Sequence, residues 1–421
     1  MVQFLTPRNI DKFQELANER CLLVPVLRDT HVHWNLTSPS FIYVYGLQSH
    51  TEWCVGFTHN DCENFTISVL SAFFCKPNYL YQKKVLVDCG ACGDAETVFW
   101  MQTGQRLNEE VTTPQICHEY WRTFAGHKNV NDFIPIMRWL EYCKDVKDVF
   151  VAVCRGFDFD TPFRRMERMV LNFVEIDKTG LQTSNGLVYC NYNPFTATTR
   201  PSNYFAGVNY AALEKNENAR AKYISRFGAA GMLVEFDFRA FHLYLIYLLH
   251  GKEMPVDIYT RLGKELYFGT DGELTESQIQ QSKILTFRQL YGHINVEYEE
   301  HPTFKMVSAL QTLFWDTYNS GELQTLLFNR KVKFPKNIDK TKLFNYMLQN
   351  FETEFCSVLI DKLLALLKDK QSKLILYVYD SFLFDIHITE ANTLLPQIKN
   401  TFKSIPHTIK YGRNYWDLTK R

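Results

Sequence analysis

The chain of 421 residues has little that would place it in a specialised class of protein. It has no apolar run near the roughly 20 residues that a membrane-spanning helix needs, and no internal repeat or low-complexity tract. Its 46 basic and 46 acidic residues balance, so net charge by itself indicates no partner. What is present, 46% hydrophobic and 15% aromatic residues, predicts a soluble, compact globular protein with no membrane partner.

The sequence also lacks a disulfide framework. Most of its eleven cysteines lie unevenly spaced between Cys21 and Cys190, and no signal-peptide pattern precedes them. This usage favours a reduced, cytoplasmic setting. Cys89 and Cys92 are half of a zinc-site pattern, but no second pair stands at suitable spacing, so structural zinc is not expected.

The order of patterns along the chain predicts a multi-domain α/β protein. Residues 22 to about 104 contain short β-rich runs, which predict an α/β domain with a leading antiparallel meander. From about 108 to 178 the apolar residues recur at helical spacing, which predicts helices that connect two larger bodies. Asn191–Pro194 then breaks regular structure, so a boundary is expected near residue 195. The predicted strands of the first body are Leu22–Leu27, Phe41–Leu47, Trp53–Thr58 and Thr97–Met101.

Two aspartates, Asp237 and Asp380, each interrupt a segment that is otherwise typical of a buried strand. Asp237 lies where a strand ends and an apolar helix begins, and Asp380 divides two β-rich runs, which predicts a hairpin with a tight turn. A carboxylate placed there costs roughly several kcal/mol unless a partner meets it. Neighbouring strands lie about 4.8 Å apart, so the two acids could share metal ions. A lone strand-end Asp, however, is more often a cap or turn residue.

Between the two aspartates, Lys283, Phe287 and Tyr291 recur every fourth residue and predict one helix face that ends at Gly292. A cation followed by two aromatic rings offers a contact for a triphosphate and then surfaces for a sugar and a base. The alternative is an amphipathic helix whose Phe and Tyr enter the core.

A short basic segment follows this helix and is broken by Pro335. It predicts an exposed loop that is able to meet phosphates, although a solvated loop between helices is an equally simple reading. Its basic residues are Arg330, Lys331, Lys333, Lys336, Lys340 and Lys342.

Taken in order, these segments resemble the motifs of the family A DNA polymerases, the bacterial DNA polymerase I type. Val234–Tyr244, Lys283–Gly292 and Tyr377–Ile386 resemble motifs A, B and C. Thr198–Asn203 is similar to the Thr-Gly-Arg-Leu-Ser-Ser segment that the family places beside the primer terminus. Asn345–Gln349 is similar to its Asn-x-x-x-Gln pair. The matches span residues 196–421, and two of the runs look most like a compact phage or viral branch.

The resemblance implies a metal site and a nucleotide site. Asp237 and Asp380, with the backbone carbonyl of Phe238, would bind two Mg²⁺ ions. Lys283 would hold the triphosphate of an incoming dNTP. Phe287 would pack on the deoxyribose, and Tyr291 would lie beside the templating base. Catalysis of this kind is mainly positioning and electrostatic stabilisation of an in-line displacement by the primer hydroxyl.

The resemblance also implies contacts to primer-template DNA. Arg200, Asn345 and Gln349 would hold the duplex at its growing end, and Asn209 falls near a position where the family has an Asn. Little room remains for the long thumb helices of the family. We therefore expect low processivity and a processivity factor or second subunit as a partner.

Several residues depart from the family pattern. His242 stands where the family has a Glu that excludes the ribose 2′-hydroxyl, so a bulky side chain remains. Ser381 replaces an auxiliary acid after Asp380, which predicts a metal site of two carboxylates. Ile279 replaces an Arg, and Tyr259 stands where a His usually helps to bind the phosphates. Fewer cations are therefore expected to face the triphosphate, and the remaining Arg residues nearby, Arg261 and Arg288, are expected to be surface residues.

The predicted fold is thus a right-hand polymerase with palm, fingers and a reduced thumb, preceded by a ribonuclease H-like exonuclease-type domain. The predicted boundaries are 1–107 for the exonuclease-like domain, 108–195 for the helical connector and reduced thumb, and 196–421 for palm and fingers, with fingers at about 251–330. The first domain is expected to be degenerate. Asp29 resembles the start of a nuclease motif, but His31 stands where a second acid belongs, and Asp61, Asp88 and Asp94 do not complete the set.

Two other functions remain open. A single-subunit RNA polymerase shares this palm and typically has Asp followed by Ser in its third motif, but His242 fills the space that such enzymes leave for the 2′-hydroxyl. A non-catalytic replication protein that binds primer-template would explain Ser381, Ile279 and Tyr259. The two metal acids and Lys283 favour a DNA polymerase, which would act in phage or viral DNA replication, without proofreading and in the host cytoplasm if phage-encoded.

Overall fold

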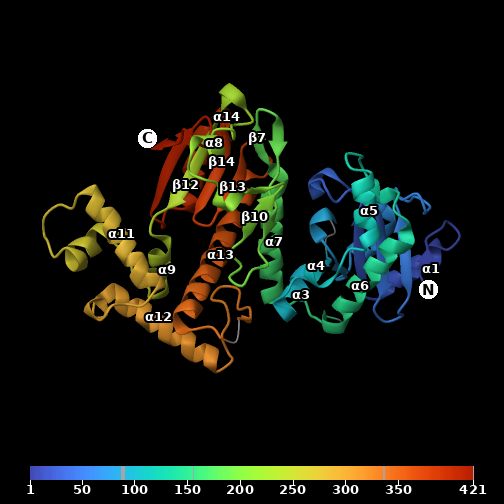
Figure 1. Ribbon diagram of the computed structural model, residues 1–421, viewed down its shortest axis with the longest axis horizontal. Coiled ribbons are helices and arrows are strands. Elements are labelled where there is room, and N and C mark those ends of the chain that lie inside the picture. The colour runs from blue at the N-terminus through green and yellow to red at the C-terminus, as the bar shows by residue number, and fades with distance from the viewer. Residues whose placement is uncertain (87–90, 155, 335–336, 421) are drawn as a thin grey trace. The chain divides into compact units, whose positions relative to one another are not determined.

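The computed structural model describes residues 1–86, 91–154, 156–334 and 337–420 (Figure 1). Its contacts divide the chain into two compact units, Met1–Leu171 and Asn172–Arg421. Four residues of the sequence patterns described above lie outside the described residues: Asp88, Cys89, Pro335 and Lys336. No helix in the described part of the chain is both long and apolar enough to span a membrane.

The first unit is built on a six-stranded mixed sheet with the order β1-β4-β3-β2-β5-β6. Strands β2, β3 and β4 form an antiparallel meander, as predicted, and β5 and β6 extend the sheet in parallel from β2. All seven residues of β2 are buried, because helices cover both faces of the sheet. The strands are β1 Gln3–Phe4, β2 Cys21–Leu27, β3 Pro39–Gly46, β4 Glu52–Gly56, β5 Tyr79–Leu80 and β6 Gly93–Asp94.

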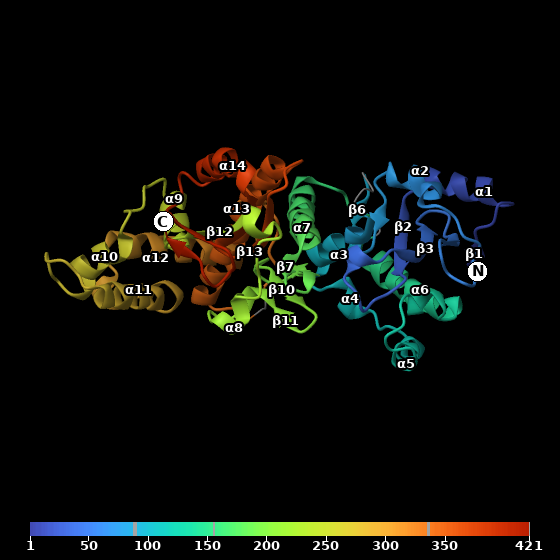
Figure 2. The ribbon, with the colours of Figure 1, turned by 90° about the horizontal axis from the view of Figure 1, so that it is seen from above.

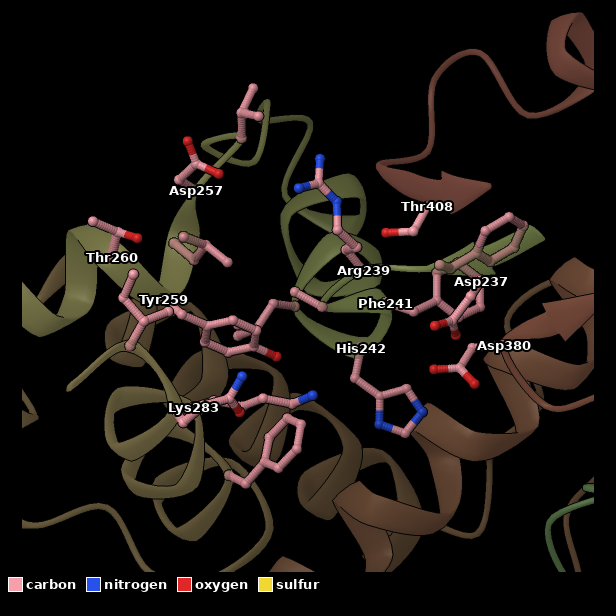
Figure 3. Close-up of a pocket in the computed structure, with 18 of the residues that line it drawn as sticks. Asp237, Arg239, Phe241, His242, Asp257, Tyr259, Thr260, Lys283, Asp380 and Thr408 are labelled. Carbon is pink, nitrogen blue, oxygen red and sulfur yellow. The ribbon is translucent and has the colours of Figure 1, made fainter. Parts of the chain in front are cut away.

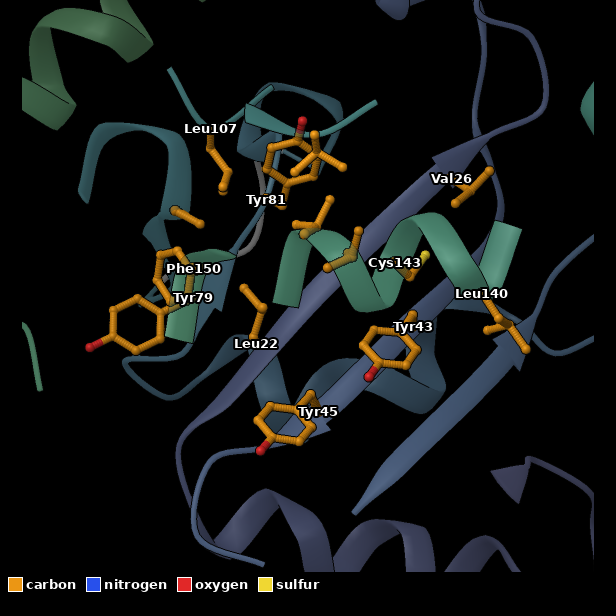
Figure 4. Packing of buried hydrophobic residues seen from close by; sticks show 14 of the residues in the cluster. Leu22, Val26, Tyr43, Tyr45, Tyr79, Tyr81, Leu107, Leu140, Cys143 and Phe150 are labelled. Atoms are coloured by element: carbon orange, nitrogen blue, oxygen red, sulfur yellow. The ribbon is translucent and has the colours of Figure 1, made fainter. Parts of the chain in front are cut away.

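Two apolar cores flank this sheet. On one face Tyr43, Tyr79 and Tyr81 pack with Leu140 and Phe150 of helix α6 (Figure 4). On the other face, residues of α1 and α2 pack against the sheet. The helices of the first unit are α1 Ile10–Glu15, α2 Ser71–Phe74, α3 Ala95–Thr103, α4 Leu107–Glu110, α5 Gln115–Thr123 and α6 Ile136–Cys154. The boundary predicted near residue 107 therefore differs from the structure, since α6 shares a core with the sheet.

The predicted strand Thr97–Met101 was wrong, because this segment lies in α3. Asp94 caps the helix by accepting a hydrogen bond from the backbone N–H of Thr97, at 2.8 Å, and Gly104 ends it with a left-handed φ of 77°. The two caps outweigh the β propensity of the residues between them.

The second unit begins inside α7 (Thr161–Thr179) rather than near residue 195. Tyr192 in β9 explains this difference, since its hydroxyl donates to the carbonyl of Tyr377 in the central sheet at 2.7 Å. Segment 172–195 is therefore anchored to the sheet that follows. The short strands here are β7 Leu181–Thr183, β8 Gly186–Val188, β9 Tyr192–Asn193, β10 Ser202–Phe205 and β11 Val208–Asn209, and the helix α8 is Glu217–Arg220.

The centre of the second unit is a five-stranded antiparallel sheet with the order β13-β14-β12-β15-β16. Its strands are β12 Gly231–Phe238, β13 Lys373–Val378, β14 Ser381–His387, β15 His407–Gly412 and β16 Thr419–Lys420. The long helix α13 (Lys340–Leu367) contacts β13, and α14 (Ile388–Thr401) contacts β14. The order places β12 in the middle of the sheet, with neighbours on both sides.

A helical subregion is inserted between β12 and α13. It consists of α9 Phe241–Leu249, α10 Ile258–Leu262, α11 Glu276–Tyr291 and α12 Pro302–Asn319, and a π-helical turn, Gly263–Tyr267, continues α10. Figures 1 and 2 show α11 and α12 on the far side of α9 from the sheet. This subregion is held to α13 by contacts from α11 and α12, and α12 also contacts α9. Helices α10, α11 and α12 fall within the range of about 251–330 that was predicted as fingers, whereas α9 precedes it.

We expect Asp385→Ala to destabilise the second unit selectively. Asp385 on β14 is fully buried and accepts hydrogen bonds from Ser225 Oγ at 2.6 Å and Arg226 Nε at 3.1 Å. Removing one partner of a buried ion pair costs about 3–5 kcal/mol. Hydrogen exchange of the β12 and β14 amides should accelerate by roughly 10²-fold or more, while amides of β2 and β3 keep their rates.

Glu390→Gln is the matched control for this experiment. Glu390 is a half-buried carboxylate of the same unit that accepts from the backbone N–H of Ser372 at 2.9 Å, and an amide oxygen can take over that role. Equal exchange rates in Asp385→Ala and Glu390→Gln would contradict a structural role for the buried pair.

Candidate active site

The pairing of β12 with β14 brings the two predicted metal acids together. Asp237 lies opposite Ser381 in the ladder, and the backbone N–H of Phe238 donates to the carbonyl of Asp380 at 2.9 Å. Asp380 occupies the tight turn between β13 and β14, as predicted, and Tyr379 before it adopts a left-handed φ of 60°. A positive φ is costly for a tyrosine, so the turn is held by its surroundings.

In both carboxyl groups the ionised form is disfavoured, so both pKa values are raised. Burial, together with the negative charges of Glu352 and Asp237, raises the pKa of Asp380 to about 6. Burial also raises the pKa of Asp237, and the charge of Lys410 opposes this shift. Two adjacent acids whose ionised forms repel each other are a donor set that a divalent cation would stabilise.

A third carboxylate, Glu235, lies two residues before Asp237 on the same strand. Its Oε2 pairs with Lys410 Nζ at 2.6 Å, and its Oε1 accepts from Ser381 Oγ at 3.3 Å. Lys410 Nζ also lies 3.7 Å from Asp237 Oδ2. Glu235 is thus neutralised by a lysine, and no group of three or more acids, His or Cys suited to a metal ion is found among the described residues.

Facing the acids, the predicted face of α11 lines a cavity of about 620 Å³ (Figure 3). Lys283 Nζ lies 5.6 Å from the ring centroid of Phe287, and the Phe287 and Tyr291 rings are 5.6 Å apart. The helix is fixed at its start by a capping box between Thr275 and Gln278. These side chains therefore face the cavity, and the alternative in which both rings enter the core does not apply.

Tyr259 of α10 reaches into the same cavity (Figure 3). Its ring lies 6.0 Å from Lys283 Nζ and edge-on to Phe287 at 6.1 Å. Burial raises the pKa of Tyr259, and the charge of Asp380 adds to this. Among the described atoms, none forms a hydrogen bond with its buried hydroxyl. The hydroxyl is thus an uncharged donor directed toward the two acids.

On the floor of the cavity, four residues from four segments form one polar chain. His242 Nε2 contacts Glu352 Oε2 at 3.0 Å, and His242 Nδ1 shares a hydrogen bond of 2.6 Å with the Tyr291 hydroxyl. Arg200 Nε lies 3.4 Å from the same Glu352 oxygen. Burial raises the pKa of Glu352, but the charge and hydrogen bond of His242 and the charge of Arg200 outweigh it, so the pKa is lowered. Glu352 is therefore ionised.

Arg200 is placed by a strained loop. Thr199 before it is buried with a φ of 55°, and its hydroxyl donates to Asn350 Oδ1 of α13 at 3.2 Å. The Arg200 guanidinium then stacks on the Tyr379 ring at 3.7 Å. Arg200 therefore contacts two elements. It stacks on Tyr379 in the turn that carries Asp380, and it pairs with Glu352 on α13.

The other predicted DNA-binding residues lie outside the cavity lining. Asn345 and Gln349 are half-buried, one turn apart on α13, and Asn345 Nδ2 donates to the carbonyl of Tyr291 at 3.1 Å. Asn209 is exposed and accepts a hydrogen bond from the backbone N–H of Ala211. The structure therefore brings Arg200 into the cavity, places Asn345 and Gln349 on the adjoining helix, and does not bring Asn209 to it.

The predicted basic loop is in part wrong. Arg330 is 5% exposed, and its Nη2 donates to Asn350 Oδ1 at 2.8 Å. Burial lowers its pKa to about 10. Lys331, Lys333 and Lys342 are exposed, as expected. Arg330 therefore supports the loop before Arg200 through Asn350, and it does not offer its charge to phosphates.

Sequence reasoning missed several charged residues of the cavity. Lys215, Arg239 and Lys410 line it, each from a different segment, whereas Arg261 is outside and pairs with Glu265 at 2.7 Å. Glu352 was missed too. An acid inside the apolar run of α13 was the available signal, since such a residue is rarely buried without a partner.

In the first unit, the acids considered for nuclease chemistry serve as structural acceptors. Asp29 accepts from the backbone N–H of His31 at 2.8 Å, and Asp61 accepts from the backbone N–H of Ile136 at 2.9 Å. Asp94 caps α3. Each carboxylate is thus occupied by backbone donors.

Comparison with known proteins identifies the fold. No model of a known protein family matches the chain, and no curated protein matches it. Among solved structures, the chain is similar to the POL domain of Pol1 from M. smegmatis, which was solved in complex with DNA primer-template and dNTP. The TM-score is 0.65 at 12% identity, and the match covers 99% of both chains. The chain therefore has the mixed α/β fold of a DNA polymerase domain.

Asp380→Asn is expected to stabilise the metal-free protein at neutral pH. The raised pKa means that the folded protein binds this proton more tightly than the unfolded chain, so stability falls as pH rises from 3.8 through about 6. The amide removes that loss. Calorimetric unfolding in EDTA should show a higher midpoint than wild type at about pH 7.5 and no difference below about pH 4.

Asp11→Asn, at an exposed carboxylate of the first unit, should leave the midpoint nearly unchanged at both pH values. An unfolding midpoint of Asp380→Asn at or below that of wild type at neutral pH would contradict the claim that the ionised carboxylate destabilises the metal-free protein.

Proposed function

We propose that the protein is a template-directed DNA polymerase of the family A type that adds deoxynucleotides to a primer 3′-hydroxyl. The observation that carries this proposal is the position of Asp237 and Asp380 across one cavity from Lys283, Phe287 and Tyr291. The polymerase-domain fold supports it.

The two aspartates fit a magnesium site of two carboxylates. Their repulsion and raised pKa values, described above, are relieved when a divalent cation is bound. Asp237, Asp380 and the carbonyl of Phe238 would hold two Mg²⁺ ions, which supply charge neutralisation for the attacking and leaving oxygens. Lys410 stands beside Asp237 and keeps part of this negative charge balanced in the absence of metal.

The cavity's own side chains then position the nucleotide. Lys283 offers its ammonium to the triphosphate, and Lys215 and Arg239 add positive charge from two other segments. These two residues offset the cations that Ile279 and Tyr259 replace. Phe287 and Tyr291 offer aromatic surfaces to the sugar and the base, and the Tyr259 hydroxyl is a neutral donor for a phosphate oxygen.

The primer terminus would lie beside Arg200, which is tied to the turn of Asp380 by stacking on Tyr379. Asn345 and Gln349 would contact the duplex on the adjoining helix. Asn209 would contact the duplex from outside the cavity lining. A partner clamp or second subunit, a phage or viral role and a cytoplasmic location remain predictions, and the likeness to a bacterial polymerase domain does not favour the phage branch.

We further propose that the first unit is an exonuclease-type domain without proofreading activity. Its meander β2-β3-β4, followed by parallel β5 and β6, supports a ribonuclease H-like topology. Asp29, Asp61 and Asp94, however, are engaged by backbone donors, and a two-metal nuclease site needs several free carboxylates.

A single-subunit RNA polymerase remains the second candidate, because Ser381 follows Asp380. Ser381 instead donates to Glu235 at 3.3 Å, and His242 fills the floor of the cavity with both ring nitrogens engaged. This arrangement leaves less space for a ribose 2′-hydroxyl and favours dNTPs as substrates.

Primer extension should occur with dNTPs and Mg²⁺ and should be lost in Asp237→Ala and Asp380→Ala, by roughly 10³-fold or more, because neither acid alone holds both ions. Lys283→Ala should raise the KM for dNTP by about tenfold or more, since it removes a charge-assisted phosphate contact. Rates with dNTPs and rNTPs are measured on one primer-template, with trap DNA so that product length also reports processivity.

Arg261→Ala is the matched control for the lysine, because this exposed cation belongs to the same helical subregion and lies outside the cavity lining. Its KM should be close to that of wild type. Binding of primer-template without any extension by the wild type would favour a non-catalytic role and reject the proposal.

The same primer-template, incubated with Mg²⁺ and without dNTPs, should keep its length, because the first unit gathers no acid cluster among its described residues. Shortening of a single-stranded primer by the wild type, abolished in Asp29→Ala, would show a working nuclease and reject this part of the proposal.

A further inference from the structure

The geometry points to Glu352 as a positioning residue that determines selectivity for dNTPs over rNTPs. Glu352 holds the His242 imidazole in one orientation, so that the ring forms a fixed wall of the cavity, and it also connects this ring to Arg200. This inference rests on the proposed polymerase function. It assigns a role to a residue that none of the recognised motifs contains.

Glu352 is the buried centre of the polar chain. Its side chain is 2% exposed, it lies on α13, and one carboxylate oxygen meets both His242 Nε2 at 3.0 Å and Arg200 Nε at 3.4 Å. A carboxylate only accepts hydrogen bonds, so His242 Nε2 must be the donor. In this buried setting, loss of either partner would leave a charge or a polar group without compensation.

Both nitrogens of the His242 ring are therefore engaged. Nε2 donates to Glu352, and Nδ1 shares a hydrogen bond with the Tyr291 hydroxyl at 2.6 Å. A flip of the ring would break both contacts, and the Tyr291 ring packs against it edge-on with centroids 5.6 Å apart. Second-layer contacts of this kind fix the orientation and tautomer of an imidazole. The ring consequently has one position.

The position of His242 in the cavity indicates which part of a bound nucleotide would lie next to its ring. His242 contacts Tyr291 through Nδ1, and Figure 3 shows the ring beside Asp380. The two acids, His242, Tyr291 and Lys283 all line the same cavity. A nucleotide with its phosphates at Lys283 and the acids, and its base at Tyr291, places its sugar beside His242. A rigid wall rejects one additional hydroxyl, whereas a ring free to turn can move aside.

Through Arg200, Glu352 is also connected to the turn that carries Asp380. Because Arg200 also stacks on Tyr379, next to Asp380, the same carboxylate links the sugar wall to the turn that carries a catalytic acid. The contact with His242 and the guanidinium of Arg200 both favour the ionised form of Glu352, which is an acceptor for Nε2. Arg200, Glu352 and His242 are thus one unit, built from a loop and two helices that are distant in sequence.

The test measures kcat/KM for a dNTP and for the matching rNTP in wild type, Glu352→Gln and Glu352→Ala. The selectivity ratio should fall by about tenfold in Glu352→Ala, because the ring is released. It should fall less in Glu352→Gln, whose amide oxygen still accepts from Nε2. The rNTP value itself should rise in Glu352→Ala, or fall much less than the dNTP value, whereas a purely structural defect lowers both values together.

Glu354→Gln is the matched control. Glu354 is also buried on α13, but it accepts from the backbone N–H groups of Leu327 and Phe328 and lies outside the cavity lining. Its selectivity ratio should equal that of wild type even if its stability changes.

A second readout is independent of turnover. ¹⁵N NMR of the histidine rings should show His242 with a proton fixed on Nε2 in wild type and Glu352→Gln, and averaged nitrogen signals in Glu352→Ala. Fixed signals in all three proteins would overturn the positioning role, even for variants that are inactive.

The outcomes separate the two proposals. Wild-type protein that extends primers with dNTPs, together with unchanged ratios in both Glu352 variants, would overturn this inference and leave the polymerase function in place. Wild-type protein that extends with neither class of nucleotide would overturn the proposed function, and sugar selectivity with it.

Discussion

The antiparallel register of β12 against β14 is the constraint on which the rest of the second unit depends. It sets Asp237 opposite Ser381 and beside Asp380, and so places two carboxyl groups of like charge in one partly buried site. A slip of one residue would turn Asp237 to the other face of the sheet. Asp385, deeper in β14, reinforces this register through Ser225 and Arg226.

The positive charges around the two acids come from several segments, and two of them, Lys215 and Lys410, are distant in sequence from both acids. Lys410 on β15 pairs with Glu235 and approaches Asp237, and Lys215 and Arg239 enter the cavity from two other segments. Lys215 and Lys410 thus bring positive charge to the cavity from outside the motif segments. Electrostatic balance at such a site depends on the sum of nearby charges, and any element that passes close enough can supply them.

The carboxylates discussed above have different partners in the two units. In the first unit, Asp29, Asp61 and Asp94 each accept hydrogen bonds from backbone N–H groups, which stabilises turns and helix starts. In the second unit, Asp237 and Asp380 face each other and an open cavity, and Glu352 is balanced by two side chains. The carboxylates with backbone partners are structural, and the two that face the cavity are available for a ligand, so their partners make the difference.

The sequence by itself determined the strands that carry Asp237 and Asp380, the hairpin between β13 and β14, and the face of α11, because these follow from local patterns with periods of two and of about four residues. It could not determine that Arg330 is buried, that Thr97–Met101 is helical between its two caps, or that Arg200, Glu352, His242 and Tyr291 form one chain. Those features depend on contacts between residues up to about 150 positions apart, such as Arg200 and Glu352. Only the packing of α13 against the sheet and α9 brings such residues together.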